Sequence, residues 1–149
     1  MEKKKILFLC TGNSCRSQMA EGFARHFHGE KFEIYSAGIE KHGMNQRAIK
    51  VMLESGVDIS AQTSKTLDDL GPILFDYVYT VCGHANELCP LFKGNAIVRH
   101  IGFDDPPKLA LGLADEEEIL SHYRRVRDEI RSWIQSLEVN ITLGQLSPQ

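Results

Sequence analysis

Residues 10–17 combine cysteines, an arginine and small polar residues in one short segment. The segment reads Cys10-Thr11-Gly12-Asn13-Ser14-Cys15-Arg16-Ser17. It follows the apolar run 6–9 directly and precedes a helical pattern directly. A loop between a strand and a helix N-terminus directs backbone N–H groups and the positive end of the helix dipole at one point. We therefore expect residues 11–16 to cradle a tetrahedral oxyanion.

Within this loop, Cys10 is the candidate nucleophile and Arg16 the candidate anion clamp, because a guanidinium can hold two oxygens at once. A helix N-terminus and a neighbouring arginine favour the thiolate, which is the attacking form of cysteine. Ser17 is placed to donate a hydrogen bond to the sulfur, and Gly12 and Asn13 tolerate a positive φ. The alternative is a strand-to-helix turn with a small buried cysteine, but the C-x5-R-S spacing favours the oxyanion site.

A second chemical signal comes from Cys82, which ends a predicted strand, and Cys89, which follows seven positions later. We interpret the two as a redox pair. Two buried thiols or half of a zinc site are the alternatives, and no C-x2-C or close histidine pair completes a zinc site. If residues 83–89 are helical when reduced, they rise about 10 Å, whereas a disulfide requires Cα atoms about 4.4–6.8 Å apart. Oxidation would then unwind this segment.

A third signal is the loop Gly102-Phe103-Asp104-Asp105-Pro106-Pro107. This loop lies near the cradle if the fourth strand lies beside the third. Asp105 is the candidate general acid, because the following proline restrains it to extended conformations and partial burial beside an anion favours its protonated form. A simple Asp-Pro turn is the alternative. Asp104 is expected to face solvent or to cap a helix.

Length, composition and net charge limit the kinds of protein that this chain can be. A chain of 149 residues with 42% hydrophobic content can bury one core, so we expect a single domain over 1–149, with a loose tail at 139–149. The net charge of −3 and the pI near 6.1 give no general attraction to nucleic acid or membranes. The run 6–9 is too short for a signal peptide or a membrane span. We expect a cytoplasmic monomer whose cysteines are catalytic or redox-active.

Apolar strand patterns alternate with helical patterns along the chain. The candidate strands are Lys5–Cys10, Phe32–Ala37, Phe75–Cys82 and Ala96–Ile101. The candidate helices are Arg16–Phe27, capped by Ser14 or Ser17, Gln46–Ser55, ended by Gly56, and Glu116–Leu137. This alternation predicts an α/β fold with a four-stranded parallel sheet, helices on both of its faces and a ligand at the carboxyl ends of the strands.

The spacing Cys10-x5-Arg16-Ser17, followed by Asp105-Pro106, resembles the low-molecular-weight protein tyrosine phosphatase superfamily. The resemblance implies that an oxyanion held by the loop amides and Arg16 is attacked by Cys10. It also implies that Asp105 protonates the departing group.

Cys82 and Cys89 narrow the resemblance to the thioredoxin-coupled arsenate reductases of that superfamily, over residues 4–137. By this resemblance, Cys82 attacks the Cys10–arsenic adduct, releases arsenite and leaves a Cys10–Cys82 disulfide. Cys89 then attacks Cys82 and carries the disulfide to the surface, where thioredoxin reduces it. Phosphate or sulfate would occupy the cradle as analogues of arsenate. Cys15 is expected to pack inside the cradle without a catalytic role.

One position departs from part of that family. Some members hold a potassium ion near residues that match Asn13, Glu21 and Ser36, with an aspartate where this chain has Lys65. We therefore expect no bound potassium and no other cofactor, and we hypothesise that the Lys65 ammonium takes over the electrostatic role of the ion. The alternative is a solvated surface lysine.

Two other functions compete with arsenate reduction. A phosphatase acting on phosphotyrosine needs the same loop and acid but no further thiol. Such phosphatases usually have an aromatic residue after the Asp-Pro pair and a proline after the Arg-Ser pair, whereas this chain has Pro107 and Gln18. Both differences favour the reductase, with weak phosphatase activity as a by-product. The second rival is a non-catalytic oxyanion sensor, which would bind without turnover.

Overall fold

The fold is built on one sheet of four parallel strands. The computed structural model describes residues 2–82, 92 and 94–142. The strands are β1 (Lys4–Cys10), β2 (Phe32–Gly38), β3 (Tyr77–Thr80) and β4 (Ile97–His100), in the order β2-β1-β3-β4. The predicted four-stranded parallel sheet is therefore confirmed, and the fourth strand pairs with the third.

Strand β1 lies in the middle of the sheet, with β2 on one side and β3 on the other. Its residues from Ile6 to Leu9 are buried, as expected for a parallel strand that is covered on both faces. In the register, Cys10 lies opposite Gly38 of β2, and Leu9 lies opposite Thr80 of β3. The loop that follows β1 therefore starts at the carboxyl edge of the sheet, between its two neighbouring strands.

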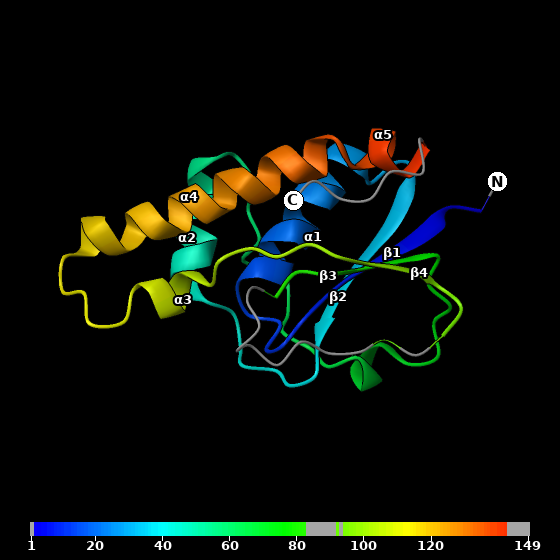
Figure 1. Cartoon of the computed structure of the whole chain (residues 1–149), viewed down its shortest axis with the longest axis horizontal. Coiled ribbons are helices and arrows are strands. Elements are labelled where there is room, and N and C mark those ends of the chain that lie inside the picture. The colour runs from blue at the N-terminus through cyan, green and yellow to red at the C-terminus, as the bar shows by residue number, and fades with distance from the viewer. Residues whose placement is uncertain (1, 83–91, 93, 143–149) are drawn as a thin grey trace.

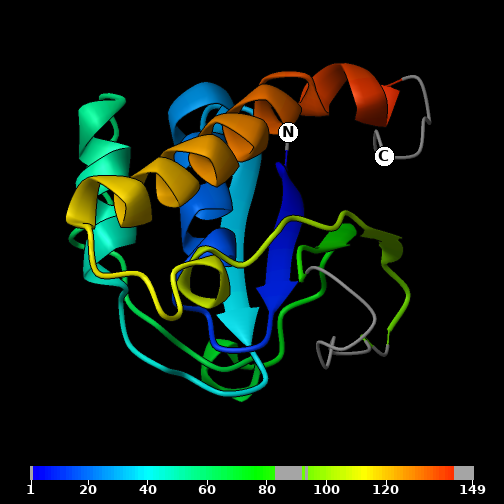
Figure 2. The same cartoon turned by 60° about the vertical axis from the view of Figure 1, so that its left-hand side comes forward.

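Three helices gather on one face of the sheet. They are α1 (Arg16–His28), α2 (Gln46–Glu54) and α4 (Glu116–Gln135). Helix α1 packs against β1 and β2, and α4 packs against α1 and α2 (Figures 1 and 2). Their apolar sides share a core with Ile6 and Phe8 of β1 and Tyr79 of β3.

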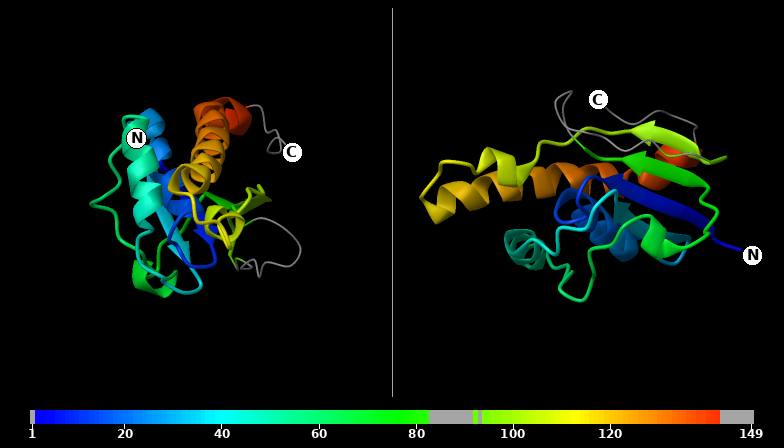
Figure 3. Two further views of the ribbon diagram at one scale, coloured as in Figure 1. Left: turned by 90° about the vertical axis from the view of Figure 1, so that its left-hand side faces the viewer. Right: turned by 90° about the horizontal axis from the view of Figure 1, so that it is seen from below.

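The opposite face of the sheet is also covered by apolar side chains. Leu7 and Leu9 of β1 pack on this face against Leu67 and Leu70. Leu70 is the last residue of the 3-10 helix η1 (Asp68–Leu70), and Leu67 immediately precedes that helix. Figure 3 shows this turn on the far side of the sheet from α4. Among the described residues, this face carries the 3-10 turn η1, which ends at Gly71 with a φ of 76°.

The predicted elements are confirmed in type, with shifts at their ends. Helix α1 has Cys15 at its N-cap position without a side-chain cap, so the predicted serine cap is wrong. Strand β3 ends two residues before Cys82, which the sequence analysis placed at the strand end. Within the described residues, no helix has the length and apolar character to cross a bilayer.

The expected loose tail is partly wrong. A short helix, α5 (Leu137–Thr142), follows α4, so residues 139–142 are helical. The reason is packing, because Leu137 is fully buried in the core and Glu138 pairs with Lys31 at 2.6 Å. Residues 143–149 lie outside the described part of the chain.

Candidate active site

The loop between β1 and α1 forms one wall of a cavity of about 390 Å³. The cavity is lined by Cys10, Thr11, Gly12, Ser14, Cys15, Arg16, His42, Asn45, Asp105 and Pro107. The structure thus brings the predicted nucleophile, arginine clamp and acid together. We call His42, Asn45, Asp105 and Pro107, which come from outside the loop, the rim.

The carbonyl groups of the loop are engaged by a neighbouring segment. Backbone N–H groups of residues 40, 42 and 45 donate to the carbonyl oxygens of Thr11, Gly12 and Ser14 at 3.0, 2.9 and 3.2 Å. Because these carbonyl oxygens are engaged on the outer side, the loop can present its N–H groups to the cavity. This is the arrangement of backbone that binds anions.

Asn13 fixes the conformation of the loop through hydrogen bonds of its side chain. Its φ is 47°, which confirms the predicted positive φ at this residue. Its amide Nδ2 donates to the hydroxyls of Ser17 and Ser36, both at 2.9 Å. Its Oδ1 accepts from the backbone N–H of Lys65 at 2.9 Å and from Nε2 of Gln18 at 2.8 Å. The side chain is fully buried, so it shapes the loop instead of lining the cavity.

The hydrogen bonds continue from Asn13 to a buried carboxylate. The hydroxyl of Ser36 donates to Oε1 of Glu21 at 2.5 Å, and Nε of Arg25 donates to Oε2 at 2.9 Å. The ammonium of Lys65 lies 3.5 Å from Glu21 Oε1 and donates to the carbonyl of Thr63 at 2.8 Å. We call the set Asn13, Ser17, Gln18, Glu21, Ser36 and Lys65 the brace.

Two details of the predicted loop are wrong. Gly12 does not have a positive φ; a Cβ there would lie 2.3 Å from Nδ1 of the half-exposed His42 ring, so the ring would have to shift. Ser17 does not donate to the Cys10 sulfur among the described contacts. Its hydroxyl instead accepts from Asn13, because the side chain is fully buried inside the brace.

Arg16 and Asp105 face each other across the cavity. Nη2 of Arg16 lies 3.6 Å from Oδ1 of Asp105, and Nη1 donates to the carbonyl of Phe103 at 3.1 Å. Asp105 immediately precedes helix α3 (Pro106–Leu109) and has the extended backbone expected before a proline, with ψ 106°. Its side chain is 31% exposed, so the carboxyl can exchange protons with solvent while facing the arginine.

Asp104 was expected to face solvent or to cap a helix, and its side chain is 34% exposed. Its Oδ2 accepts from Nη2 of Arg125 on α4 at 2.8 Å. This ion pair ties the loop that carries Asp105 to α4.

Cys15 lies inside the cradle as a buried thiol. Burial raises the pKa of Cys15 far above its ordinary value, and the Asp105 carboxylate acts in the same direction. The thiol therefore stays neutral, and its position in the core beside α1 agrees with the expected packing role.

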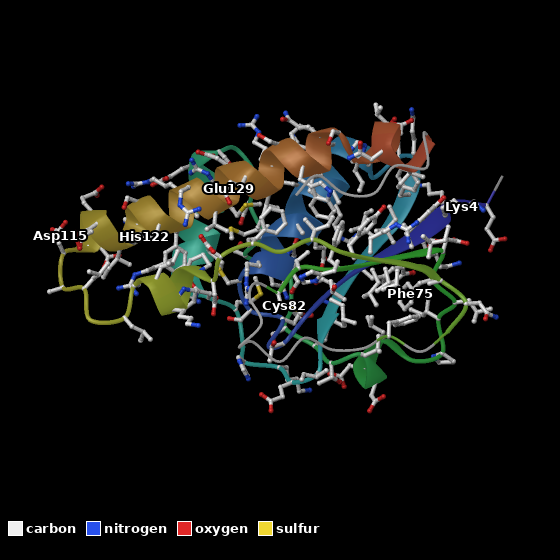
Figure 4. All side chains as sticks on the ribbon, viewed as in Figure 1. Lys4, Phe75, Cys82, Asp115, His122 and Glu129 are labelled. Carbon is white, nitrogen blue, oxygen red and sulfur yellow. The ribbon has the colours of Figure 1, made fainter. Side chains whose placement is uncertain are left out.

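Cys82 lies beside the nucleophile in the sheet register. Leu9 pairs with Thr80, and the N–H of Val81 donates to the carbonyl of Leu9. Val81 is therefore level with Cys10, and Cys82 comes one residue later. Figure 4 shows Cys82 at the end of the sheet remote from Lys4. Cys82 is buried and disulfide-bonded, whereas Cys10 and Cys15 are free thiols. Cys89 and the predicted helical segment 83–89 lie outside the described residues.

Two rim residues and one glycine of the site were not predicted from the sequence. His42 and Asn45 follow β2 at no spacing that signals a site, and only the fold brings them to the cavity. Asn45 caps α2 through the N–H of Ala48 and donates to the hydroxyl of Tyr123 at 3.1 Å. A Cβ on Gly38 would lie 2.6 Å from two backbone oxygens, so only glycine fits where β2 approaches the loop.

Comparison with known proteins agrees with this geometry. Residues 5–144 match the family described as low molecular weight phosphotyrosine protein phosphatase. The chain belongs to this family. The arsenate reductase of Halalkalibacterium halodurans is 52% identical to this phosphatase-family chain over 130 residues, which cover 87% of this chain and 91% of that protein.

Solved structures show the same fold. An arsenate reductase in the phosphate-binding state matches with a TM-score of 0.76 and 33% identity, covering 93% of this chain and 98% of that one. A thioredoxin-dependent arsenate reductase of Corynebacterium glutamicum matches with a TM-score of 0.65 and 27% identity, covering 96% of this phosphatase-family chain and 64% of that one.

Proposed function

We propose that this protein reduces arsenate to arsenite. The observation that carries the proposal is the single cavity in which Cys10, Arg16 and Asp105 meet, with Cys82 next to the end of β1 in the sheet register. The relatives described as arsenate reductases support this activity over hydrolysis of phosphotyrosine.

In the first step, arsenate lies in the loop between the backbone N–H groups and the guanidinium of Arg16. The thiolate of Cys10 attacks arsenic, and a sulfur–arsenic bond forms. Asp105 donates a proton to the opposite hydroxyl, which leaves as water. Arsenic remains As(V) in this adduct, and the loop N–H groups stabilise the charge on its oxygens.

The second step requires the reduced form of the protein, in which Cys82 is a free thiol, and the thiolate of Cys82 attacks the sulfur of Cys10. The sulfur–arsenic bond breaks, its electron pair stays with arsenic, and arsenite leaves as As(III). The two sulfurs are oxidised to a Cys10–Cys82 disulfide. Cys89 then displaces Cys10 from Cys82, and thioredoxin reduces the resulting Cys82–Cys89 disulfide. The relay fits a monomer in the cytosol, where thiols are kept reduced.

A coupled assay tests the relay. Arsenate-dependent NADPH consumption with thioredoxin and thioredoxin reductase is measured for the wild type, Cys82→Ser and Cys89→Ser, with Cys15→Ser as the matched control. We expect turnover to be lost in the first two variants and largely retained in the control. Hydrolysis of para-nitrophenyl phosphate, which needs neither of these thiols, should persist in all four proteins. Turnover of arsenate by Cys89→Ser would contradict the relay.

We further propose that the Lys65 ammonium replaces a potassium ion. Its position 3.5 Å from the buried carboxylate of Glu21 supports this, because that carboxylate also accepts from Ser36, which bonds to Asn13. A cation there neutralises the brace and steadies the loop. We expect kcat/KM for arsenate to be the same in sodium and potassium buffers, whereas Lys65→Ala should gain a dependence on potassium. A clear rise of the wild-type value in potassium would refute this proposal.

A further inference from the structure

We propose that His42 determines which fourth substituent an oxyanion in the cavity can carry, so that free oxyanions are selected over aryl esters. The inference rests on the proposed function, because the nucleophile and the acid are those assigned above. It concerns the rim, and it assigns a specificity-determining role to a residue that takes no part in the relay.

The direction of the fourth substituent follows from in-line attack. The loop and Arg16 hold three oxygens of the tetrahedral anion, and Cys10 approaches from the floor of the cavity. The group that departs lies opposite the attacking sulfur, and it therefore points toward the rim. In arsenate this group is a hydroxyl, whereas in an aryl phosphate it is a ring bonded through oxygen.

The imidazole of His42 closes the rim on the side of Gly12. The backbone N–H of His42 donates to the carbonyl of Gly12 at 2.9 Å, and Nε2 of the ring lies 2.7 Å from a carboxylate oxygen of Glu40. The ring occupies the space where a side chain on Gly12 would project, with Nδ1, Cγ and Cε1 all within 3 Å of that position. Glu40 therefore holds the ring against the loop at the edge of the cavity.

The other rim residues are fixed by stronger constraints. Asn45 caps α2 and bonds to Tyr123, Asp105 faces Arg16, and Pro107 belongs to α3. Pro107 also offers no aromatic ring against which an aryl group could stack. The side chain of His42 is 53% exposed and is held by an exposed carboxylate, so it is the part of the rim that can be altered without disturbing the loop.

The role of His42 can be measured by binding alone. Phenylphosphonate carries three oxygens and an aryl group at the fourth position, whereas inorganic phosphate carries a hydroxyl or oxygen there. Calorimetric titration gives a Kd for each anion with the reduced wild type, His42→Ala and His42→Phe. His26→Ala, which removes an exposed histidine of α1 away from the cavity, is the matched control.

We expect His42→Ala to improve binding of phenylphosphonate relative to phosphate by about tenfold, which is typical of relieving one steric contact in a pocket. kcat/KM for para-nitrophenyl phosphate should rise relative to that for arsenate by a similar factor. His42→Phe should keep the selectivity of the wild type, because its ring fills the same space, and the control should change neither ratio.

An unchanged ratio in His42→Ala would overturn the proposal. Equal gains in His42→Ala and His42→Phe would also overturn it, because they would assign the effect to the charge of the imidazole instead of its shape. The binding arm is independent of the relay. If the protein does not turn over arsenate but His42→Ala still shifts the ratio of the Kd values for phenylphosphonate and phosphate, the proposed function is contradicted and the role of His42 is retained.

Discussion

The brace and the rim support the same loop in opposite ways. In the brace, Asn13 is fully buried and its side chain makes four hydrogen bonds, and Glu21 is 3% exposed with three partners. In the rim, His42 and Asp105 are partly exposed, and the contact between Asp105 and Arg16 is 3.6 Å long. One side of the loop is fixed by buried hydrogen bonds, and the other faces solvent.

This difference separates two tasks. Buried hydrogen-bonded side chains hold the loop backbone in the conformation that binds an anion, because any movement would leave polar groups unsatisfied. Exposed side chains at the rim can exchange protons and can change without unfolding the protein. We therefore expect substitutions in the brace to affect stability and every activity together, and substitutions in the rim to affect particular steps.

The largest expected effect comes from Asp105→Asn. The variant should fold normally but lose proton donation to the leaving group, which is worth about 10²–10⁴-fold in kcat. The effect should appear in both arsenate turnover and ester hydrolysis, with little change in the Kd for phosphate. Asp104→Asn, which removes the neighbouring negative charge but keeps an oxygen that can accept from Arg125, is the matched control and should keep its rate. A normal kcat in Asp105→Asn would remove the carboxyl from the mechanism.

A smaller effect, on stability and on every activity together, is expected for Asn13→Ala. The change removes both donors and the acceptor of the side chain and forces alanine to a φ of 47°, so we expect a loss of about 2–4 kcal/mol in the free energy of unfolding. Asn13→Gly removes the same hydrogen bonds without backbone strain, and its loss should be smaller by about 1 kcal/mol. Urea unfolding measures both. A variant as stable as the wild type would show that the brace does not hold the loop.

The smallest effect is expected at Asn45, which lines the cavity but also caps α2. Asn45→Ala should lower the free energy of unfolding by about 1 kcal/mol through loss of the cap. Asn45→Asp retains an acceptor for the N–H of Ala48 and should keep most of the stability. If instead both variants lose anion affinity equally without losing stability, Asn45 belongs with the groups that bind the anion.

The sequence predicted the centre of the site but not its surroundings. Cys10, Arg16 and Asp105 could be assigned because their chemistry and local spacing are visible in the chain, and the alternation of strands and helices predicted the parallel sheet that brings 10 and 105 together. The positive φ of Asn13 was also predictable, because asparagine tolerates it.

The roles of Gly12 and His42 depend on a contact between segments far apart in the chain. Gly12 leaves room for the ring of His42, and no local pattern indicates this partner. Ser17 bonds to Asn13, only four positions earlier, and both side chains are fully buried within the brace. Among the described residues, the 3-10 turn on the second sheet face was also not predicted, and Leu67 and Leu70 pack against that face beside or within it.

The most direct test of the account is a single turnover of reduced Cys89→Ser with excess arsenate in the absence of thioredoxin. The account predicts release of one arsenite per protein molecule, and peptide mass mapping should then find a disulfide between Cys10 and Cys82 with Cys15 still a free thiol. Release of arsenite with Cys82 still reduced, or formation of the bond between Cys10 and Cys15 instead, would contradict it.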